Sequence, residues 1–319
     1  MEVIIIGAGV AGITLADRLR RSDLSVRLIE KSRGAGGRMA TRQTRSGIHF
    51  DHGAQYFTAR SDEFRSALKT GYWAGAVQQW GGGGDPIAGD SWYVGAPRMK
   101  SALEAAALEL NVQYDARIET IERRDHRWVL SGEGLSCDIE GDVVVLSCPA
   151  PQAMALTPFS ARIQTDLSGV VMEPCWALMI AFDERINAAQ SVFQPESGAF
   201  SWIAKNSSKP GREHGIETWV AHASPTWSQE NLELSAEAVA STLWRKLPAI
   251  FGCACPEPIY LAAHRWRYAR VARAAEKPLL TDETGSLLAI GDWCLGPRVE
   301  CAFLSGSAAG KYIEQMISA

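Results

Sequence analysis

The stretch that decides the fold is Val3-Ile4-Ile5-Ile6-Gly7-Ala8-Gly9-Val10-Ala11-Gly12, close to the N-terminus. Its first four residues form an unbroken β-branched run, which is typical of a parallel strand covered on both faces. The first glycine of such a turn permits the tight bend, the second lets a pyrophosphate approach the backbone, and the third allows close packing of a helix. The stretch therefore predicts a strand, a dinucleotide-binding turn and a helix.

A second apolar run, Val26 to Ile29, completes a strand–helix–strand unit and ends at Glu30. A carboxylate at that place can accept hydrogen bonds from ribose hydroxyls, while the free NH groups and the dipole of the helix favour phosphates. A glycine-rich turn without a ligand is the alternative, and the turn by itself does not separate NAD from FAD. We expect cofactor contacts from Gly7, Gly9, Ala11, Gly12, Glu30 and Lys31.

Composition excludes several classes of partner. No uncharged apolar run approaches the roughly 20 residues that span a bilayer, and the N-terminal apolar run is too short for a signal peptide, so we expect a cytoplasmic protein with no membrane contact. A net charge of -4 gives no basic field for nucleic acid. The seven cysteines are scattered without a CxxC pair, so we expect reduced thiols and no metal site.

The 319 residues suggest two interleaved domains. We assign residues 1–58, 92–158 and 285–319 to a cofactor-binding domain and residues 59–91 and 159–284 to a substrate domain. Tryptophans and alternating segments such as 218–222 predict a mainly antiparallel sheet in the second domain, with a helix over 234–247. Residues 81–84 are expected to form a flexible loop. Further helices are expected over 99–110 and 305–316, and strands over 112–114, 128–130, 142–146 and 287–290.

A second glycine-rich bend, Arg33-Gly-Ala-Gly36-Gly37-Arg38, follows shortly after Glu30. It can approach the same pyrophosphate from the other side, with Arg38 donating charge-assisted hydrogen bonds to phosphate or flavin oxygens. NAD enzymes seldom need this second clamp. The bend therefore favours FAD, which we expect to be bound non-covalently.

This RxGGR-type segment resembles the FAD-binding region of the flavin amine oxidase superfamily. Asp51 to Phe57 is similar to the segment of that superfamily that passes the flavin ring, and Gly291-Asp292 with Glu300 to Gly306 is similar to its C-terminal flavin-binding helix. The resemblance implies an α/β, two-domain FAD-binding Rossmann-type fold like that of p-hydroxybenzoate hydroxylase, with a mainly antiparallel-sheet substrate domain. It also implies cofactor contacts from Gly37, Arg38, Ala54, Gln55, Tyr56, Ile118, Asp292, Glu300 and Ala302.

Four segments together, SRGAGGRMATR, DHGAQYFTAR, AHRWRYAR and GDWCLGPRVECAFLSG, resemble the bacterial renalase-like oxidases. That resemblance implies oxidation of the 2- and 6-dihydro isomers of NAD(P)H to NAD(P)⁺, with the flavin passing the electrons to O2 to give H2O2. The small-molecule partners would then be a dihydronicotinamide and O2.

Arg298 separates this activity from ordinary amine oxidation. Amine oxidases carry a Tyr of the aromatic cage two residues before a Glu, and here Arg298 stands two residues before Glu300. A fixed cation repels an ammonium but suits phosphates or carboxamide oxygens. Arg298 could instead pair with Glu300 or cap the helix. An FAD-dependent amine oxidase or desaturase of a small substrate, and a non-catalytic flavin-binding protein, stay open as alternatives.

The segment from His264 to Arg270 alternates as a strand does, so His264, Trp266, Tyr268 and Arg270 are expected on one face. His264 could hydrogen-bond the substrate, and Tyr268 or Trp266 could stack on it. A solvated basic edge strand is the alternative. Trp202 is a candidate pocket wall or a core residue, and His52 and His222 are expected to be structural. The candidate catalytic residues are His264, Arg298, Tyr268 and Trp202.

Overall fold

A six-stranded sheet carries the glycine-rich turn, and its strands come from distant parts of the chain. The computed structural model describes residues 1–81, 91–213 and 215–318, so most of the loop expected at 81–84 lies outside the described residues. All neighbouring strands are parallel except the edge pair β17–β18. In sheet order the strands are β17 (Leu280–Thr281), β18 (Leu287–Ala289), β11 (Val143–Leu146), β1 (Glu2–Ile6), β2 (Ser25–Ile29) and β7 (Val112–Gln113).

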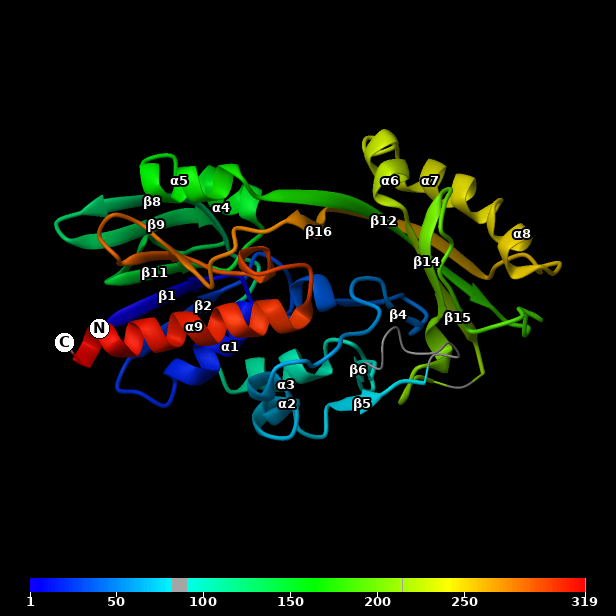
Figure 1. The fold of residues 1–319 in the computed structure, drawn as a ribbon, viewed down its shortest axis with the longest axis horizontal. Coiled ribbons are helices and arrows are strands. Elements are labelled where there is room, and N and C mark those ends of the chain that lie inside the picture. Colours follow the sequence, from blue (N-terminus) through cyan, green and yellow to red (C-terminus); the bar gives the residue numbers. More distant parts are fainter. Residues whose placement is uncertain (82–90, 214, 319) are drawn as a thin grey trace.

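Both faces of this sheet are buried, as the β-branched run in β1 predicts. Val3 and Ile5 pack into one hydrophobic cluster, and Ile4 and Ile6 pack into another. The first face is covered by α1 (Val10–Leu19), α3 (Ser101–Leu108) and α9 (Val299–Ser318). The second is covered by β8 (Arg117–Arg124), β9 (Arg127–Glu133), β10 (Ile139–Gly141), α4 (Ala150–Leu156) and α5 (Ala161–Ser168), as Figure 1 shows.

The C-terminal helix α9 lies directly on α1. A Cβ atom added to Gly306 would be 2.4 Å from the carbonyl oxygen of Ala11, so only glycine allows this approach. The sequence predicts a helix over 305–316, whereas α9 begins at Val299, six residues earlier, because residues 299–304 are also helical. This close contact brings the start of α9 to the glycine-rich turn.

A five-stranded antiparallel sheet forms the other end of the elongated molecule (Figure 1). Helices α6 (Pro225–Glu230), α7 (Ala236–Trp244) and α8 (Leu247–Phe251) lie on its outer side. The long strands β12 and β16 run from this sheet back toward the first one. In sheet order the strands are β13 (Val192–Phe193), β14 (Phe200–Lys205), β15 (Glu217–Ala223), β12 (Val171–Phe182) and β16 (Tyr260–Arg273).

One predicted helix is divided in the structure. The segment expected as a single helix over 234–247 begins only after Ser235, whose hydroxyl caps α7 by accepting from Ala238 N. It ends at Trp244, and Pro248 lies in the first turn of the separate helix α8. Proline has no NH group to continue a helix but fits a first turn, which explains the division.

Short elements join the two sheets. None of the helices within 1–81, 91–213 and 215–318 is long and apolar enough to cross a membrane. The short elements are η1 (Gly37–Met39), β3 (Thr41–Gln43), β4 (His49–Asp51), α2 (Asp62–Ala67), η2 (Gly71–Trp73), β5 (Val77–Gln79), β6 (Tyr93–Gly95), η4 (Asn206–Ser208) and η5 (Asp292–Cys294).

Candidate active site

The predicted dinucleotide turn has the geometry that a phosphate group needs. Gly9 caps α1 without any side-chain hydrogen bond, and the first turn of α1 carries no acidic residue. A Cβ atom added to Gly9 would meet nothing within 4 Å, so there is open space beside this helix start, where a phosphate would bind. Glu30, at the end of β2, lies beside the turn and accepts a 2.8 Å hydrogen bond from Ala8 N.

The second glycine bend lies against the first. Gly36 N donates to the Ala8 carbonyl oxygen at 3.0 Å, and a Cβ atom on Gly37 would be 3.3 Å from Gly9 Cα. Both Gly36 and Gly37 have positive φ angles, of 129° and 51°, which glycine adopts without strain. The two glycine bends therefore lie in contact, and their approach to one pyrophosphate stays a prediction.

Arg38 follows this bend and joins three segments. Its guanidinium donates to both carboxylate oxygens of Asp292, at 2.6 and 2.9 Å, and more weakly to the carbonyl oxygen of Ala269 in β16, at 3.4 Å. The side chains of Arg38 and Asp292 are 28% and 13% exposed. Two predicted cofactor residues from opposite ends of the chain thus meet, and Tyr268 directly precedes Ala269 in β16.

The segment after β4 continues from Arg38. Ala54 N donates to the Arg38 carbonyl oxygen at 2.9 Å, and a Cβ atom on Gly53 would lie 2.0 Å from that oxygen. At the start of α9, Glu300 accepts from the backbone NH groups of Arg60 and Ser61 through Oε1. Its other oxygen, Oε2, is buried and has no hydrogen-bond partner among the described residues.

These features fit a flavin dinucleotide. The helix start and the paired glycine bends can hold a pyrophosphate, and Glu30 can reach a ribose. The backbone contact between Arg38 and Ala54 would extend the cofactor-binding surface beyond the turn. The unpaired Oε2 of Glu300 is a buried acceptor at the helix that closes the same region. Arg38, Asp292 and Glu300 would therefore lie along the cofactor.

Residues of four strands form one row across the antiparallel sheet. Trp202 pairs with His222, His222 with Ala177, and Ala177 with His264, so all four side chains project from the same face. His52, just after β4, lies against this face, because its carbonyl oxygen accepts from His222 Nε2 at 3.2 Å and from Trp266 Nε1 at 3.0 Å.

The rings of His52, His264 and Trp266 form a compact group. Their centroids are 4.6 to 5.1 Å apart, with His52 edge-on to His264 and stacked on Trp266. In the pairing of β12 with β16, Cys175 lies opposite Trp266 and Glu173 lies opposite Arg270. Between these two pairs β16 has two more residues than β12. Arg270 therefore stays on the same side of the sheet as Trp266. The predicted common face for His264 and Trp266 is confirmed by the register.

The histidines of this group are held neutral. Burial, with smaller contributions from His264 and Arg42, lowers the pKa of His52 to about 3. Burial lowers the pKa of His222 to about 4. Burial and the positive charge of Arg42 also lower the pKa of His264. At neutral pH this face offers uncharged donors and acceptors, and the nearby fixed charge is positive.

Trp202 belongs to an aromatic group beside the row. Tyr56 stacks on Trp92 with a centroid distance of 4.4 Å, and Trp202 lies 5.1 and 5.5 Å from these two rings. Trp202 is 8% exposed, and its Nε1 atom is buried with no hydrogen-bond partner among the described residues. It is thus packed with the core, while its NH group still lacks an acceptor.

Other predicted residues lie outside these groups. Lys31 is exposed, and its amine lies 3.5 Å from Gln152 Oε1. Ile118 is buried in β8 in the cluster that includes Ile4 and Ile29. Their contacts with the cofactor stay predictions, as do those of Ala302, which lies one turn into α9.

Arg298 is exposed and immediately precedes α9. Its carbonyl oxygen accepts from Cys301 N at 3.1 Å and Ala302 N at 3.3 Å, so its backbone begins the helix. This backbone role is compatible with either a substrate contact or a structural role of the side chain.

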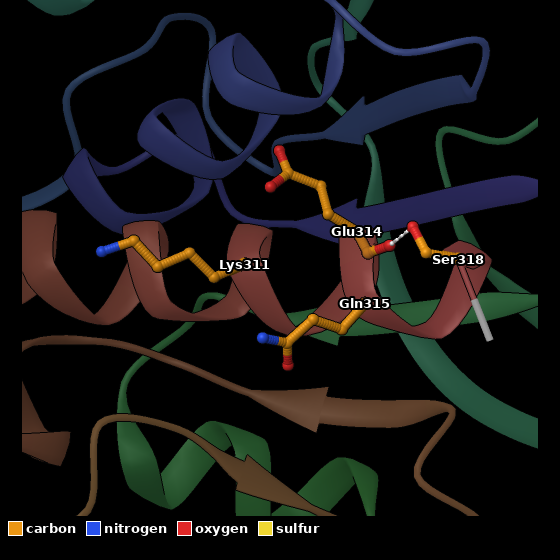
Figure 2. Close-up of a pocket in the computed structure, with 4 residues that line it drawn as sticks. All are labelled: Lys311, Glu314, Gln315 and Ser318. Carbon is orange, nitrogen blue, oxygen red and sulfur yellow. Dashed lines mark hydrogen bonds between the residues drawn. The ribbon is translucent and has the colours of Figure 1, made fainter.

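A surface pocket of about 340 Å³ lies elsewhere, on the last turns of α9 (Figure 2). It is lined by Lys311, Glu314, Gln315 and Ser318, none of which is a predicted cofactor or substrate residue. We assign it no role in catalysis.

Three buried charged residues beside the flavin-side segment carry no distinctive signal in the sequence. Asp51 belongs to that segment but matches no motif for a buried ion pair, and Lys209 and Arg212 lie in a polar stretch without a motif. In the structure all three are buried and in contact. A cluster of buried charges among distant residues requires the tertiary structure.

Known proteins share this architecture. Residues 5–70 match a family model described as an NAD(P)-binding Rossmann-like domain, and residues 83–306 match one described as flavin containing amine oxidoreductase. Among solved structures, an inferred protoporphyrinogen oxidase from Exiguobacterium sp. 255-15 has a TM-score of 0.80 at 12% identity, covering 99% of each chain.

Putrescine oxidase has a TM-score of 0.73 at 14% identity, with 99% of each chain covered. Cyclohexylamine oxidase from Brevibacterium oxydans IH-35A has a TM-score of 0.74 at 12% identity, covering 100% of this chain and 99% of that one. At these identities the likeness concerns the fold. Because the second family model spans most of the sequence, the chain belongs to the flavin-containing amine oxidoreductase family.

Proposed function

We propose that this protein is a renalase-like oxidase of the 2- and 6-dihydro isomers of NAD(P)H, with the cytoplasm as its compartment. Its family makes it an FAD-dependent oxidoreductase. When bound, FAD supplies a hydride acceptor at N5 and passes the electron pair to O2. The net reaction converts a dihydronicotinamide, O2 and one proton into NAD(P)⁺ and H2O2.

The observation that carries the proposal is the neutral histidine group beside a positive charge. A dihydropyridine ring with a carboxamide is uncharged and can use the NH groups and ring nitrogens of His52 and His264. An ammonium substrate would meet the field of Arg42, which lowers the pKa of both histidines. Among the described residues, no acidic side chain hydrogen-bonds or pairs with His52, His264 or Trp266.

The roles of the side chains follow from this chemistry. In the proposed complex His264 hydrogen-bonds the carboxamide, Trp266 or Tyr268 stacks on the ring, and Arg298 contacts the phosphates. A dihydropyridine regains aromaticity by losing only a hydride, so these residues position the ring and need not remove a proton. This explains why neutral histidines suffice.

Oxidation of a small amine is the second candidate, and one observation favours it. Tyr56, Trp92 and Trp202 form an aromatic group, and aromatic rings attract amines and their cations. The family description is also compatible with this activity. Arg298 and Arg42 favour the dihydronicotinamide instead.

The experiment is anaerobic mixing of the purified yellow protein with each probe, followed by absorbance near the flavin maximum. The probes are 2-dihydro-NAD(P), 6-dihydro-NAD(P), freshly purified 4-dihydro-NADH, putrescine and cyclohexylamine. We expect bleaching within the mixing time for the 2- or 6-dihydro isomers and one H2O2 per substrate after O2 is admitted. Faster bleaching by an amine would overturn the proposal. Bleaching by none of the probes would favour the non-catalytic alternative.

A further inference from the structure

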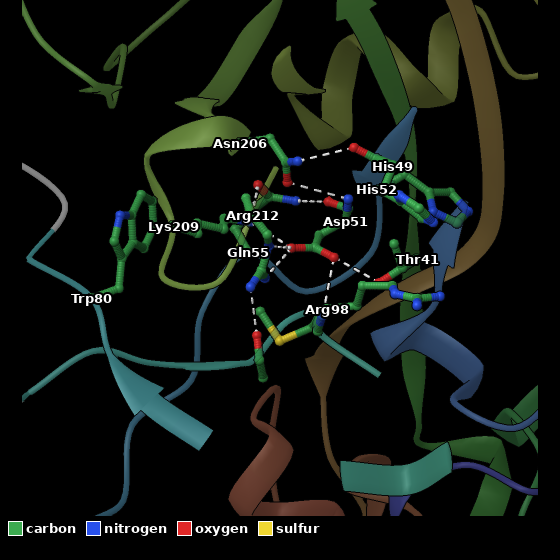
Figure 3. Close-up of polar contacts among 12 residues, drawn as sticks. Thr41, His49, Asp51, His52, Gln55, Trp80, Arg98, Asn206, Lys209 and Arg212 are labelled. Atoms are coloured by element: carbon green, nitrogen blue, oxygen red, sulfur yellow. Dashed lines mark hydrogen bonds and ion pairs between the residues drawn. The ribbon is translucent and has the colours of Figure 1, made fainter. Parts of the chain in front are cut away.

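A buried cluster of charges surrounds Asp51, the last residue of β4 (Figure 3). Its Oδ1 accepts from Thr41 Oγ1 at 2.6 Å and Met99 N at 3.1 Å. Its Oδ2 accepts from Lys209 Nζ at 3.4 Å and from the Arg212 guanidinium. The side chains of Asp51, Lys209 and Arg212 are 1%, 0% and 5% exposed.

Both cations come from the connection between β14 and β15 of the antiparallel sheet. This connection contacts β4 again through Asn206, whose Oδ1 accepts from Asp51 N at 3.2 Å and whose amide donates to His49 O at 3.1 Å. Arg212 also donates to the Gly95 carbonyl oxygen at 2.7 Å. The connection therefore attaches the antiparallel sheet to the segment that begins at Asp51.

Lys209 makes a second contact on the same segment. Its amine donates to Gln55 Oε1 at 3.2 Å, and it lies 5.4 Å from the centroid of the Trp80 ring. The amide of Gln55 donates to the carbonyl oxygens of Asp51 and Gly53. The Gln55 side chain thus folds back over Gly53 and Ala54, and the hydrogen bond from Lys209 fixes which end of its amide faces the backbone.

Gly53 and Ala54 are the residues that lie against Arg38. We propose that Lys209 is a positioning residue for the flavin, because it holds Asp51 and Gln55 in place and so fixes the Gly53–Ala54 backbone along the cofactor path. The proposal depends on FAD binding and not on the identity of the substrate.

Stability alone is a poor reason for this arrangement. Burying ions costs several kcal/mol each in desolvation, and replacing buried ion pairs by apolar side chains is often neutral or stabilising. Retaining two cations around one carboxylate is better explained by a need for one defined geometry. The two-point contact of Lys209, to a carboxylate and to an amide four residues later, supplies that geometry.

The test compares Lys209→Met with Lys205→Met. Lys205 is the matched control, since it lies at the end of β14 and pairs with buried Glu217, yet the contacts of its side chain do not include Asp51 or Gln55. For Lys209→Met we expect the FAD Kd to rise about tenfold, because the Gly53–Ala54 backbone is no longer held along the cofactor path, together with a shifted flavin absorbance spectrum and midpoint potential. For Lys205→Met we expect a lower Tm with all three flavin properties unchanged. An unchanged Kd, spectrum and potential in Lys209→Met, or equal changes in Lys205→Met, would overturn the proposal.

Gln55→Leu provides a second route if Lys209→Met does not fold. It removes the acceptor of Lys209 but leaves the ion pairs of Asp51 intact, so the same spectral change is expected. Where both single variants fold, the double variant should change the Kd no further than either one. Additive changes would show that Lys209 and Gln55 act separately, which contradicts the proposal.

Discussion

Arg38 offers the sharpest test of how the cofactor is held, because its guanidinium pairs with Asp292 and is also predicted to contact FAD. The pair with Asp292 has two hydrogen bonds. The predicted contact with FAD follows from the position of Arg38 directly after the glycine bend that touches the dinucleotide turn. A charge-assisted hydrogen bond contributes about 1.5 to 3 kcal/mol. Loss of one such bond to a phosphate or flavin oxygen in Arg38→Ala should therefore weaken FAD binding roughly 10- to 150-fold.

The pair with Asp292 predicts a second effect, on the protein without FAD. After Arg38→Ala, the Asp292 carboxylate keeps the hydrogen bond from Trp293 N at 2.9 Å but loses its cation. Since this carboxylate is 13% exposed, the free energy of unfolding should fall by about 1 to 3 kcal/mol. Arg38→Lys should lie between wild type and Arg38→Ala, because it keeps the charge but not the planar fork.

The assay is fluorescence titration of apoprotein with FAD, paired with thermal unfolding of the same apoprotein. Arg18→Ala is the control, since Arg18 also forms a two-bond pair, with Glu314 at 2.8 and 2.6 Å, and it joins α1 to α9 away from the turn. Arg18→Ala should lower Tm and leave the FAD Kd at the wild-type value. A wild-type Kd in Arg38→Ala would refute the reasoning, since it would show that Arg38 serves Asp292 alone.

Three further predictions concern the substrate, the cofactor linkage and pH. Arg298→Tyr on flavin-replete protein should lower kcat/KM for 2- or 6-dihydro-NAD(P) roughly 10- to 100-fold; a lower Tm and FAD content without a kinetic change would instead assign Arg298 to the helix start. Acid precipitation should release the FAD into the supernatant, because burial raises the pKa of the Cys294 thiol to about 12 and Cys301 is only 2% exposed; a yellow pellet would contradict non-covalent binding. Burial lowers the pKa of Lys209 from 10.5 to about 8, so between these pH values the unfolded chain binds more protons and stability should rise with pH. Denaturant titrations at several pH values should show that the free energy of unfolding rises more steeply with pH in wild type than in Lys209→Met. The same pH dependence in both proteins would contradict a lowered pKa of Lys209.

The paired glycine bends and the place of Glu30 could be predicted from the sequence because their signals are local. Gly7, Gly9 and Gly12 directly follow a β-branched run, and each glycine has a role that depends only on its neighbours. Glu30 ends the next strand, and parallel strands bring their carboxyl ends to one edge of the sheet. The contact between Gly37 and Gly9 likewise needs only two bends close together in the chain.

The charge cluster could not be predicted in this way. Asp51 and Lys209 are 158 residues apart, and Lys209 occurs in a polar segment that would be read as a solvated surface. Only the packing of the β14–β15 connection on β4 removes them from water. Burial then changes their properties, since it lowers the pKa of Lys209 while the two cations outweigh the effect of burial on Asp51 and hold its pKa well below the usual range.

The proposed substrate face likewise depends on tertiary structure, through the register of its strands. Alternation within β16 predicts that His264 and Trp266 share a side, but it says nothing about what lies beside them. The pairing of β14, β15, β12 and β16 puts Trp202, His222 and the small Ala177 into the row with His264, and a shift of one residue in any strand would turn its member to the other face. Burial then keeps His52 and His222 neutral. The proposed preference for an uncharged ring over an ammonium would therefore be a property of the assembled face, and variants that keep each histidine but alter the register should lose it.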